Sequence, residues 1–188
     1  SHGHSGFKRA IYGSTAGAII QQARAPVLLV PAQKAVRLDA KSRLFREGLI
    51  PLDESECSEE VLPFAIALGQ LGASRYTLLE VVPSGSAKEA GVRLNGDAAI
   101  NTELNRAAAQ AHVQRVAQRL EQRALPVTTV VLEQEPIAET IIACAERMTA
   151  DLIALATHGR DCIGRLMTGG VADRVARAEA PSRALRVR

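Results

Sequence analysis

Aromatic residues are scarce in this chain: among 188 residues there are three Phe, two Tyr and no Trp. Proteins that hold single-stranded nucleic acid commonly stack bases on aromatic side chains. The net charge of +3, from 23 Lys and Arg against 20 Asp and Glu, is also modest for a protein that binds a polyanion. The sequence therefore predicts no nucleic-acid partner.

Long apolar runs are missing as well. No run reaches the roughly 18 residues that a helix needs to cross a bilayer, so we expect no membrane association. No positively charged segment followed by an apolar stretch opens the chain, so the sequence shows no sign of a secretory signal, and a signal upstream of Ser1 stays open. The three cysteines, Cys57, Cys144 and Cys162, are odd in number and scattered. This pattern favours a reducing cytoplasm over a disulfide framework.

The chain does contain a repeated glycine pattern. Near the start, Ser1-His2-Gly3 is followed by nine residues and then Gly13-Ser14; near the end, Thr157-His158-Gly159 is followed by nine residues and then Gly169-Gly170. A repeat about one domain apart indicates a tandem array of one fold. A Gly-rich turn that leads into a helix indicates an anion site, because free backbone N–H groups and the helix dipole both favour phosphate there.

Strand-like and helix-like segments alternate from about Leu44 onward. Short apolar or β-branched segments predict strands over 49–52, 76–82, 127–132, 151–157 and 184–187, and helical spacing predicts helices over 58–71, 101–123, 136–148 and 170–178. Strict alternation predicts an α/β fold, with a parallel sheet and helices on both faces. Ligands of such sheets bind beyond the carboxyl ends of the strands, where Asp53, Val81–Val82 and Thr157–Gly159 lie.

Three of the predicted helices carry specific expectations. Ser58 is the expected N-cap of the first, and Pro136 is expected in the first turn of the third. The apolar stripe of the first helix is Val61, Phe64, Ala65, Leu68 and Leu71. The stripe that we expect the second helix to pack in the core is Val113, Val116, Ala117 and Leu120.

The chain divides into three parts. Residues 1–30 supply only a loop, a helix over 14–24 and a strand over 27–30, which corresponds to the last third of the repeated unit. Residues 31–43 contain charges without a long apolar period and are predicted to be a linker. Residues 44–188 contain all the alternating segments and are predicted to form one complete domain.

The complete domain resembles the universal stress protein family. Leu49-Ile50-Pro51-Leu52-Asp53-Glu54-Ser55-Glu56 is similar to the family's first strand and its Pro-x-Asp-Gly-Ser turn. Ala150-Asp151-Leu152-Ile153 leading into Thr157-His158-Gly159-Arg160 is similar to its fourth strand and the loop that follows. In the N-terminal copy, Gly3, Gly13 and Ser14 match the family's nucleotide pattern of Gly-x-x-Gly, nine residues and Gly-Ser/Thr. The resemblance covers almost the whole chain, as a tandem form whose first domain is represented by its C-terminal end.

The resemblance implies a Rossmann-like nucleotide-binding fold, an open five-stranded parallel sheet in the order 3-2-1-4-5, and ATP as the ligand, alone or with Mg²⁺. The residues that it places at the nucleotide in the complete domain are Asp53, Val81, Ala156, His158, Gly159, Arg160, Gly169, Gly170 and Val171. In the first copy they are Gly3, Gly13, Ser14 and Thr15. The complete domain departs from the family pattern where Ala156 replaces the first glycine, Gly170 the Ser/Thr, and Glu54 the glycine of the turn.

The resemblance implies an adenine-nucleotide-binding, stress-response regulatory protein rather than an enzyme, and we expect no catalytic residue and no metal site. Two other interpretations stay open. One is a degenerate module that binds no nucleotide and acts in dimerisation or protein interaction; the other is a weak ATP hydrolase, for which the sequence offers no assigned general base or arginine finger. For Asp53, the alternative to a nucleotide contact is a helix cap. For His2 and His158, hydrogen bonds that order the loops are the expected role, because no nucleophile or carboxylate is placed beside them by sequence.

The resemblance also implies association through the last strands, paired antiparallel. The segment Val27–Val30 is apolar, and an uncovered strand edge of this kind favours pairing. We expect Val27–Val30 to pair with Ala184–Val187, either within the chain as a tandem pairing or across a homodimer.

Overall fold

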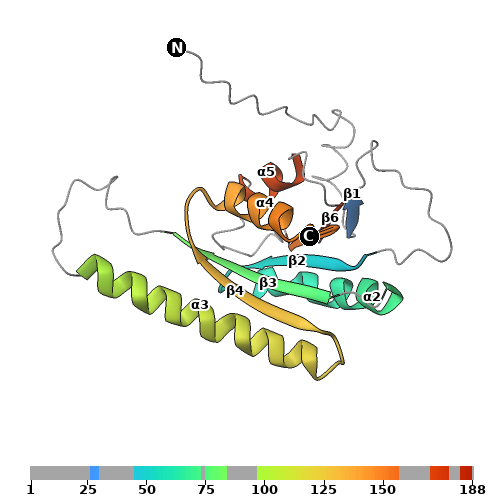
Figure 1. The fold of residues 1–188 in the computed structure, drawn as a ribbon, viewed down its shortest axis with the longest axis horizontal. Helices are drawn as coiled ribbons and strands as arrows, with labels where there is room; N and C mark the ends of the chain where they lie inside the picture. Colours follow the sequence, from blue (N-terminus) through green and yellow to red (C-terminus); the bar gives the residue numbers. More distant parts are fainter. Residues whose placement is uncertain are drawn as a thin grey trace, which may run out of the picture.

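The structure is a computed structural model that describes residues 26–29, 45–72, 75–83, 97–156, 170–177 and 183–187. Helices lie on both sides of one sheet (Figure 1). In chain order the elements are strand β1 (Val27–Leu29), strand β2 (Glu47–Leu52), 3-10 helix η2 (Glu56–Val61), helix α2 (Leu62–Gly72), strand β3 (Arg75–Val82), helix α3 (Asp97–Glu121), strand β4 (Val127–Glu133), helix α4 (Ile137–Arg147), strand β5 (Leu152–Ala156), helix α5 (Val171–Arg177) and strand β6 (Arg183–Val187).

The sheet has six strands in the order β1-β6-β5-β2-β3-β4. The neighbours from β4 to β6 pair in parallel, so the α/β class with a parallel sheet is confirmed, and these five strands follow the order 3-2-1-4-5 when counted from β2. The difference from the predicted sheet is one added strand. That strand is β1, which pairs antiparallel with β6 through Val27 opposite Arg186, Leu28 opposite Leu185 and Leu29 opposite Ala184.

Successive residues of β5 supply two different cores, one on each face of the sheet. Leu152, Ala154 and Ala156 belong to the core under α2 and α3, whereas Ile153 and Leu155 belong to the core under α4 and α5. This alternation follows from the two-residue period of a strand, and a strand that is buried on both faces is apolar throughout. In Figure 1 the helices α4 and α5 lie above the sheet and α3 lies below it.

The long helix α3 packs through the stripe that its sequence predicts. The four residues of this stripe are all buried: Val113, Val116, Ala117 and Leu120. They contribute to the same core cluster as Leu78 of β3, so the prediction that this stripe is core packing is confirmed.

The start of the first helical segment differs from the prediction. Ser55, and not Ser58, is the N-cap: its backbone is extended, and its side chain accepts a hydrogen bond from the backbone N–H of Ser58. The segment opens as the 3-10 helix η2, which has about three residues per turn instead of 3.6. Val61 and Ala65 of the predicted stripe are buried and Leu68 packs against the core, whereas Phe64 is 39% exposed and Ile66 is buried in addition. Similarly, Pro136 is the extended N-cap of α4 and not a first-turn residue.

Parts of the predicted organisation lie outside the described residues. These parts are the helix over 14–24 and the linker over 31–43. The predicted domain boundaries at 30 and 44 therefore stay predictions.

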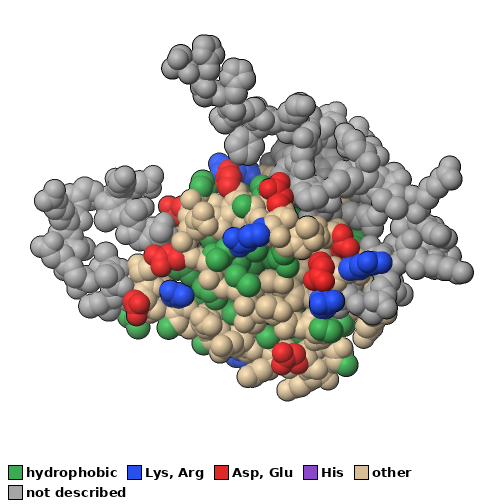
Figure 2. Space-filling model, viewed as in Figure 1, with side chains coloured by type: hydrophobic (Ala, Val, Ile, Leu, Met, Phe, Trp, Pro, Cys, Tyr) green, Lys and Arg blue, Asp and Glu red, His purple; other side chains and the backbone are tan. Residues whose placement is uncertain are grey.

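The described surface mixes both signs of charge. On the face in Figure 2, blue Lys and Arg side chains alternate with red Asp and Glu side chains, and hydrophobic side chains show between the two helical layers. In that region lies β4, an edge strand whose residues are half-buried or exposed. Within the described ranges, no helix has the length and apolar character that a membrane span requires.

Candidate functional site

The candidate site lies at the point where the chain reverses its direction of travel across the sheet. From β2 the chain proceeds to β3 and β4 on one side, and then returns to β5 and β6 on the other side. Open parallel sheets bind ligands in the crevice outside the carboxyl ends of the strands at such a switch point. Asp53 directly follows β2, and Ala156 ends β5, so both lie at this crevice.

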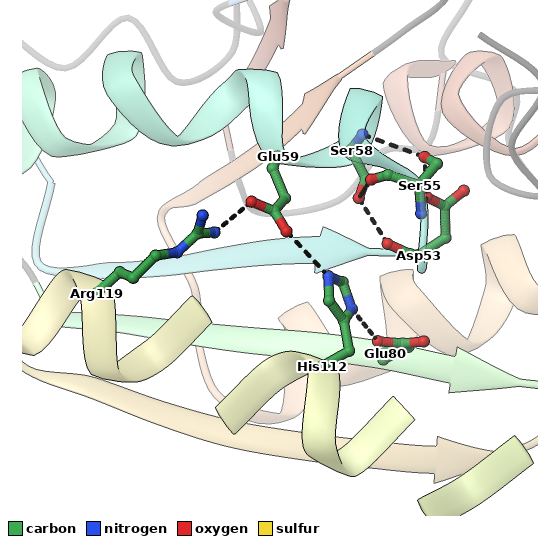
Figure 3. Close-up of polar contacts among 7 residues, drawn as sticks. All are labelled: Asp53, Ser55, Ser58, Glu59, Glu80, His112 and Arg119. Atoms are coloured by element: carbon green, nitrogen blue, oxygen red, sulfur yellow. Dashed lines mark hydrogen bonds and ion pairs between the residues drawn. The ribbon is translucent and has the colours of Figure 1, made fainter. Parts of the chain in front are cut away.

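The Asp53 turn, which we define as residues 53–55, is fixed by short-range hydrogen bonds. The Oδ1 atom of Asp53 accepts from the backbone N–H of Ser55 at 3.0 Å and also from the Ser55 hydroxyl. The hydroxyl of Ser58 donates to the backbone carbonyls of Asp53, at 2.7 Å, and of Ser55, at 2.8 Å. Asp53 is 9% exposed, so its carboxylate is held in one orientation at the strand end (Figure 3). Ser55 supplies the helix cap, and the cap hypothesis for Asp53 is therefore wrong.

The other predicted site residues within the described ranges take different positions. Ala156 is 7% exposed and is part of the core under α2 and α3. Val81 and Val171 are half-buried against the core under α4 and α5. Gly170 is exposed in the turn before α5, and its carbonyl accepts from the backbone N–H of Arg174 at 3.0 Å. All four lie at the ends of β3 and β5 or at the start of α5, which face the same end of the sheet.

The remaining predicted nucleotide residues lie outside the described residues. In the complete domain these are His158, Gly159, Arg160 and Gly169, and in the first copy they are Gly3, Gly13, Ser14 and Thr15. His2, a second histidine weighed above, also lies outside. Their roles stay predictions from the sequence.

A buried charged network beside the Asp53 turn was missed by the sequence analysis. His112 of α3 is 4% exposed and lies between two carboxylates: its Nδ1 is 2.8 Å from Oε2 of Glu80, and its Nε2 is 3.2 Å from Oε1 of Glu59. The second carboxylate oxygen of Glu59 accepts from the guanidinium of Arg119. The network thus joins β3, η2 and α3, as Figure 3 shows. The available signal was Glu80 itself, a charged residue inside an apolar strand, where burial requires a partner.

The pKa values of the two carboxylates of this network are shifted in opposite directions. Burial raises the pKa of Glu80, the hydrogen bond and charge of His112 act against this shift, and the nearby carboxylates of Asp53 and Glu54 add to it. Burial also acts to raise the pKa of Glu59, but hydrogen bonds and charges from Arg119 and His112 outweigh it and hold this pKa below its usual value. The difference follows from exposure and partners, because the Glu80 side chain is 7% exposed, whereas that of Glu59 is 24% exposed and is also paired with the guanidinium of Arg119.

A Glu59→Gln variant is expected to lose stability only where Glu59 is ionised. A lowered pKa in the folded state means that the ionised group stabilises the fold above the ordinary glutamate pKa of about 4.3, and that this contribution disappears as the pH falls through the lowered value. The gap in unfolding free energy between the parent and Glu59→Gln should be largest above the ordinary glutamate pKa and should close as the pH falls through the lowered pKa of Glu59. Urea unfolding at stepwise pH measures the gap, and a gap independent of pH would contradict the assignment.

The two described cysteines differ in state. Cys57 of η2 is disulfide-bonded, whereas Cys144 of α4 is free and buried. A bond at Cys57 departs from the expectation drawn from scattered cysteines, because spacing along the chain does not report which thiols fold close together. The cytoplasmic location inferred from the cysteines stays a prediction.

The comparison with protein families decides the family. The model of the universal stress protein family matches residues 45–181. This chain belongs to the universal stress protein family. A universal stress protein of Methanocaldococcus jannaschii is 30% identical over 133 residues, which are 70% of this chain and 76% of the relative.

Solved structures of this family have the same fold. A universal stress protein of Archaeoglobus fulgidus superposes with a TM-score of 0.69 and 17% identity, over 100% of this chain and 60% of that one. A universal stress protein in complex with cAMP gives 0.55 and 15%, over 77% of this chain and 97% of that one. An Arabidopsis thaliana member with AMP bound gives 0.52 and 11%, over 76% of this chain and 92% of that one. At these identities the likeness concerns the fold, and this chain spans about three fifths of the Archaeoglobus chain.

Proposed function

We propose that this universal stress protein is an adenine-nucleotide-binding, stress-response regulatory protein that acts without turnover. The observation that carries the proposal is the fixed carboxylate of Asp53 at the switch point of the sheet, next to the end of β5, from which the predicted glycine loop continues. Two solved structures of the same fold contain AMP or cAMP, which share an adenosine group. This supports adenosine as the anchored part of the ligand.

The distribution of charge at the crevice favours one orientation of the nucleotide. The carboxylates of Asp53, Glu54 and Glu80 are close enough to one another to raise the pKa of Glu80. This negative charge repels phosphate, whereas the carboxylate of Asp53 accepts hydrogen bonds from ribose hydroxyls or the adenine amine. We therefore place adenosine at the Asp53 turn and Val81, and the phosphates over Gly159 and Gly169–Val171, where the sequence predicts backbone N–H groups and Arg160 to face an anion.

The described residues fit this ligand at its adenosine end. The methyl group of Ala156, at the position of the family's first glycine, is 7% exposed and packs in the core under α2 and α3. This substitution is therefore compatible with a nucleotide in the crevice. In the described part of the chain, no group of three or more His, Cys, Asp or Glu side chains is arranged to hold a metal ion.

The nucleotide proposal has a direct test. The full chain is purified without added nucleotide and denatured, and the released small molecules are identified by chromatography and mass spectrometry. A stoichiometric adenine nucleotide is expected, with much less from an Asp53→Asn preparation. Absence of nucleotide, together with absence of binding when ATP or AMP is added, would instead favour a module that binds none.

The third possibility, a weak ATP hydrolase, is tested by a turnover assay with ATP and Mg²⁺. Because we propose a protein that acts without turnover, we expect no phosphate release above that of a Gly159→Asp variant. Turnover that disappears in Gly159→Asp would assign the protein to the hydrolases.

We propose that the last strands associate within one chain, because β1 pairs with the outer edge of β6 of the same chain. A strand edge that is already paired offers no ladder to a second copy. Analytical ultracentrifugation is therefore expected to give a monomer. A dimer that persists when β1 is interrupted by Leu28→Pro would contradict this arrangement, and a dimer that dissociates in this variant would indicate exchange of β1 between copies.

A further inference from the structure

The described residues contain a buried pair of ionisable side chains that the proposed nucleotide contacts do not use. His112 and Glu80 are 4% and 5% exposed, and they lie under the strand ends, away from the exposed surface. Charged groups are rarely fully buried unless they are paired, and a buried pair seldom adds stability over an apolar pair of the same size. The position of the pair therefore needs a reason other than stability.

The network connects directly to the Asp53 turn. Glu80 lies opposite Leu52 in the register of β2 and β3, one residue before Asp53. Glu59 follows Ser58 in η2, and the Ser58 hydroxyl bonds to the carbonyl of Asp53 at 2.7 Å. The turn is thus held locally by serine hydroxyls, and the helix that carries one of those serines is tied to α3 by His112.

His112 forms a hydrogen bond at each of its two ring nitrogens and so bridges two carboxylates. A carboxylate only accepts, so each contact requires a proton between the ring nitrogen and the oxygen. Nδ1 connects to β3 through Glu80, and Nε2 connects to η2 through Glu59. Arg119 holds the same Glu59 from the exposed side of α3 with a side chain that is 54% exposed, so His112 is the buried and better-ordered of the two connections.

We propose that His112 is a positioning residue for the adenosine end of the site: bridging Glu80 and Glu59, it fixes η2 against α3 and β3 and thereby orders the turn that presents Asp53. The expected change in nucleotide affinity rests on the proposed function. The expected change in the order of the Asp53 turn applies to the free protein and does not depend on nucleotide. Without the bridge, η2 keeps its serine contacts, the disulfide of Cys57 and the buried Val61 but loses its buried polar anchor, so the Asp53 turn samples more conformations and binds nucleotide more weakly.

The test uses the full chain and a variant that removes the bridge without leaving a buried charge. His112→Leu alone would strand the Glu80 carboxylate, so the test variant is His112→Leu/Glu80→Leu, in which an apolar pair replaces the buried pair. The matched control is Glu80→Gln, which removes the charge near Asp53 but retains an amide that can accept from or donate to Nδ1 of His112. A second control is Arg119→Gln, which removes the exposed connection to Glu59.

Two readouts separate this inference from the nucleotide proposal. Backbone hydrogen exchange of the free protein over residues 53–61 should be at least tenfold faster in the double variant, while exchange over β3 and α3 and the melting temperature stay close to those of the parent. Glu80→Gln should exchange like the parent. Affinity for ATP in calorimetry should fall about tenfold in the double variant and little in either control.

Each outcome has one meaning. Parent-like exchange over residues 53–61 in a folded double variant would overturn the positioning role. Fast exchange in the double variant, in a protein whose parent binds no nucleotide, would uphold the role of His112 and reject the proposed function. If the double variant does not fold, the comparison of Glu59→Ala with Arg119→Gln decides: faster exchange over the turn only in Glu59→Ala supports His112 as the anchor, and equal exchange contradicts it.

Discussion

Replacing Gly48 with alanine is expected to destabilise the domain by roughly 1–3 kcal/mol, because it overfills a closed part of the core. A Cβ atom at Gly48 would lie 2.5 Å from both Cδ1 and Cε1 of Tyr76, the residue opposite it in β3. Tyr76 is 2% exposed, and its hydroxyl donates to the carbonyl of Ala65 at 2.5 Å. The ring cannot retreat, because a Cβ at Gly69 of α2 would lie only 2.8 Å from its opposite edge.

The matched control is Gly69→Ala. Its contact is less severe, and alanine in a helix gains about 0.8–1.0 kcal/mol over glycine, so we expect a smaller loss than at Gly48. Replacing Tyr76 by Leu in the Gly48→Ala background should show positive coupling in a double-mutant cycle, because the smaller side chain relieves the contact. Thermal and urea unfolding measure these differences. A Gly48→Ala protein within about 0.5 kcal/mol of the parent would show that the ring moves freely, contrary to this packing.

The second large effect concerns ligand affinity. Asp53→Asn is expected to weaken ATP binding roughly 10- to 150-fold, the equivalent of losing one hydrogen bond to a charged group, about 1.5–3 kcal/mol. The substitution keeps the size of the side chain, and an amide oxygen can still accept from the backbone N–H of Ser55. The loss is therefore one of charge at the adenosine end rather than one of shape.

Two comparisons make the Asp53 result specific. Inorganic tripolyphosphate contains no adenosine, so its affinity should be unchanged or slightly higher in Asp53→Asn. Ser55→Ala removes the hydroxyl that bonds to Oδ1 of Asp53 while leaving the carboxylate, so it should weaken ATP binding much less. Equal losses in Asp53→Asn and Ser55→Ala would mean that Asp53 only orders the turn.

The arrangement of the sheet could be predicted from the sequence because its strands are buried on both faces. In β5, every residue from Leu152 to Ala156 is apolar, and the structure uses them alternately in the two cores. The apolar stripe of α3 is regular over several turns, so its burial could also be predicted from the sequence. Regular elements impose one period on many residues, so a few misplaced residues do not hide the pattern.

Local features were harder to predict, because they depend on a single turn. The start of the first helical segment was placed at Ser58 instead of Ser55, since both serines precede acidic residues and only the observed 3-10 geometry separates them. Phe64 of the predicted stripe is exposed, although Val61 and Ala65 of the same stripe are buried. His112 and Glu80 are 32 residues apart in sequence, and nothing in their spacing shows that they meet. The sequence did identify Asp53, because its position after an apolar strand follows from topology.

The most direct test of the nucleotide-binding claim is a calorimetric titration of ATP into the full chain, beside Gly159→Asp. Aspartate at position 159 would place a side chain and a like charge where we expect the phosphates. We expect measurable binding to the parent and its loss in Gly159→Asp, with both proteins showing the same melting temperature without ligand. Unchanged affinity in Gly159→Asp, or no binding to either protein, would contradict it.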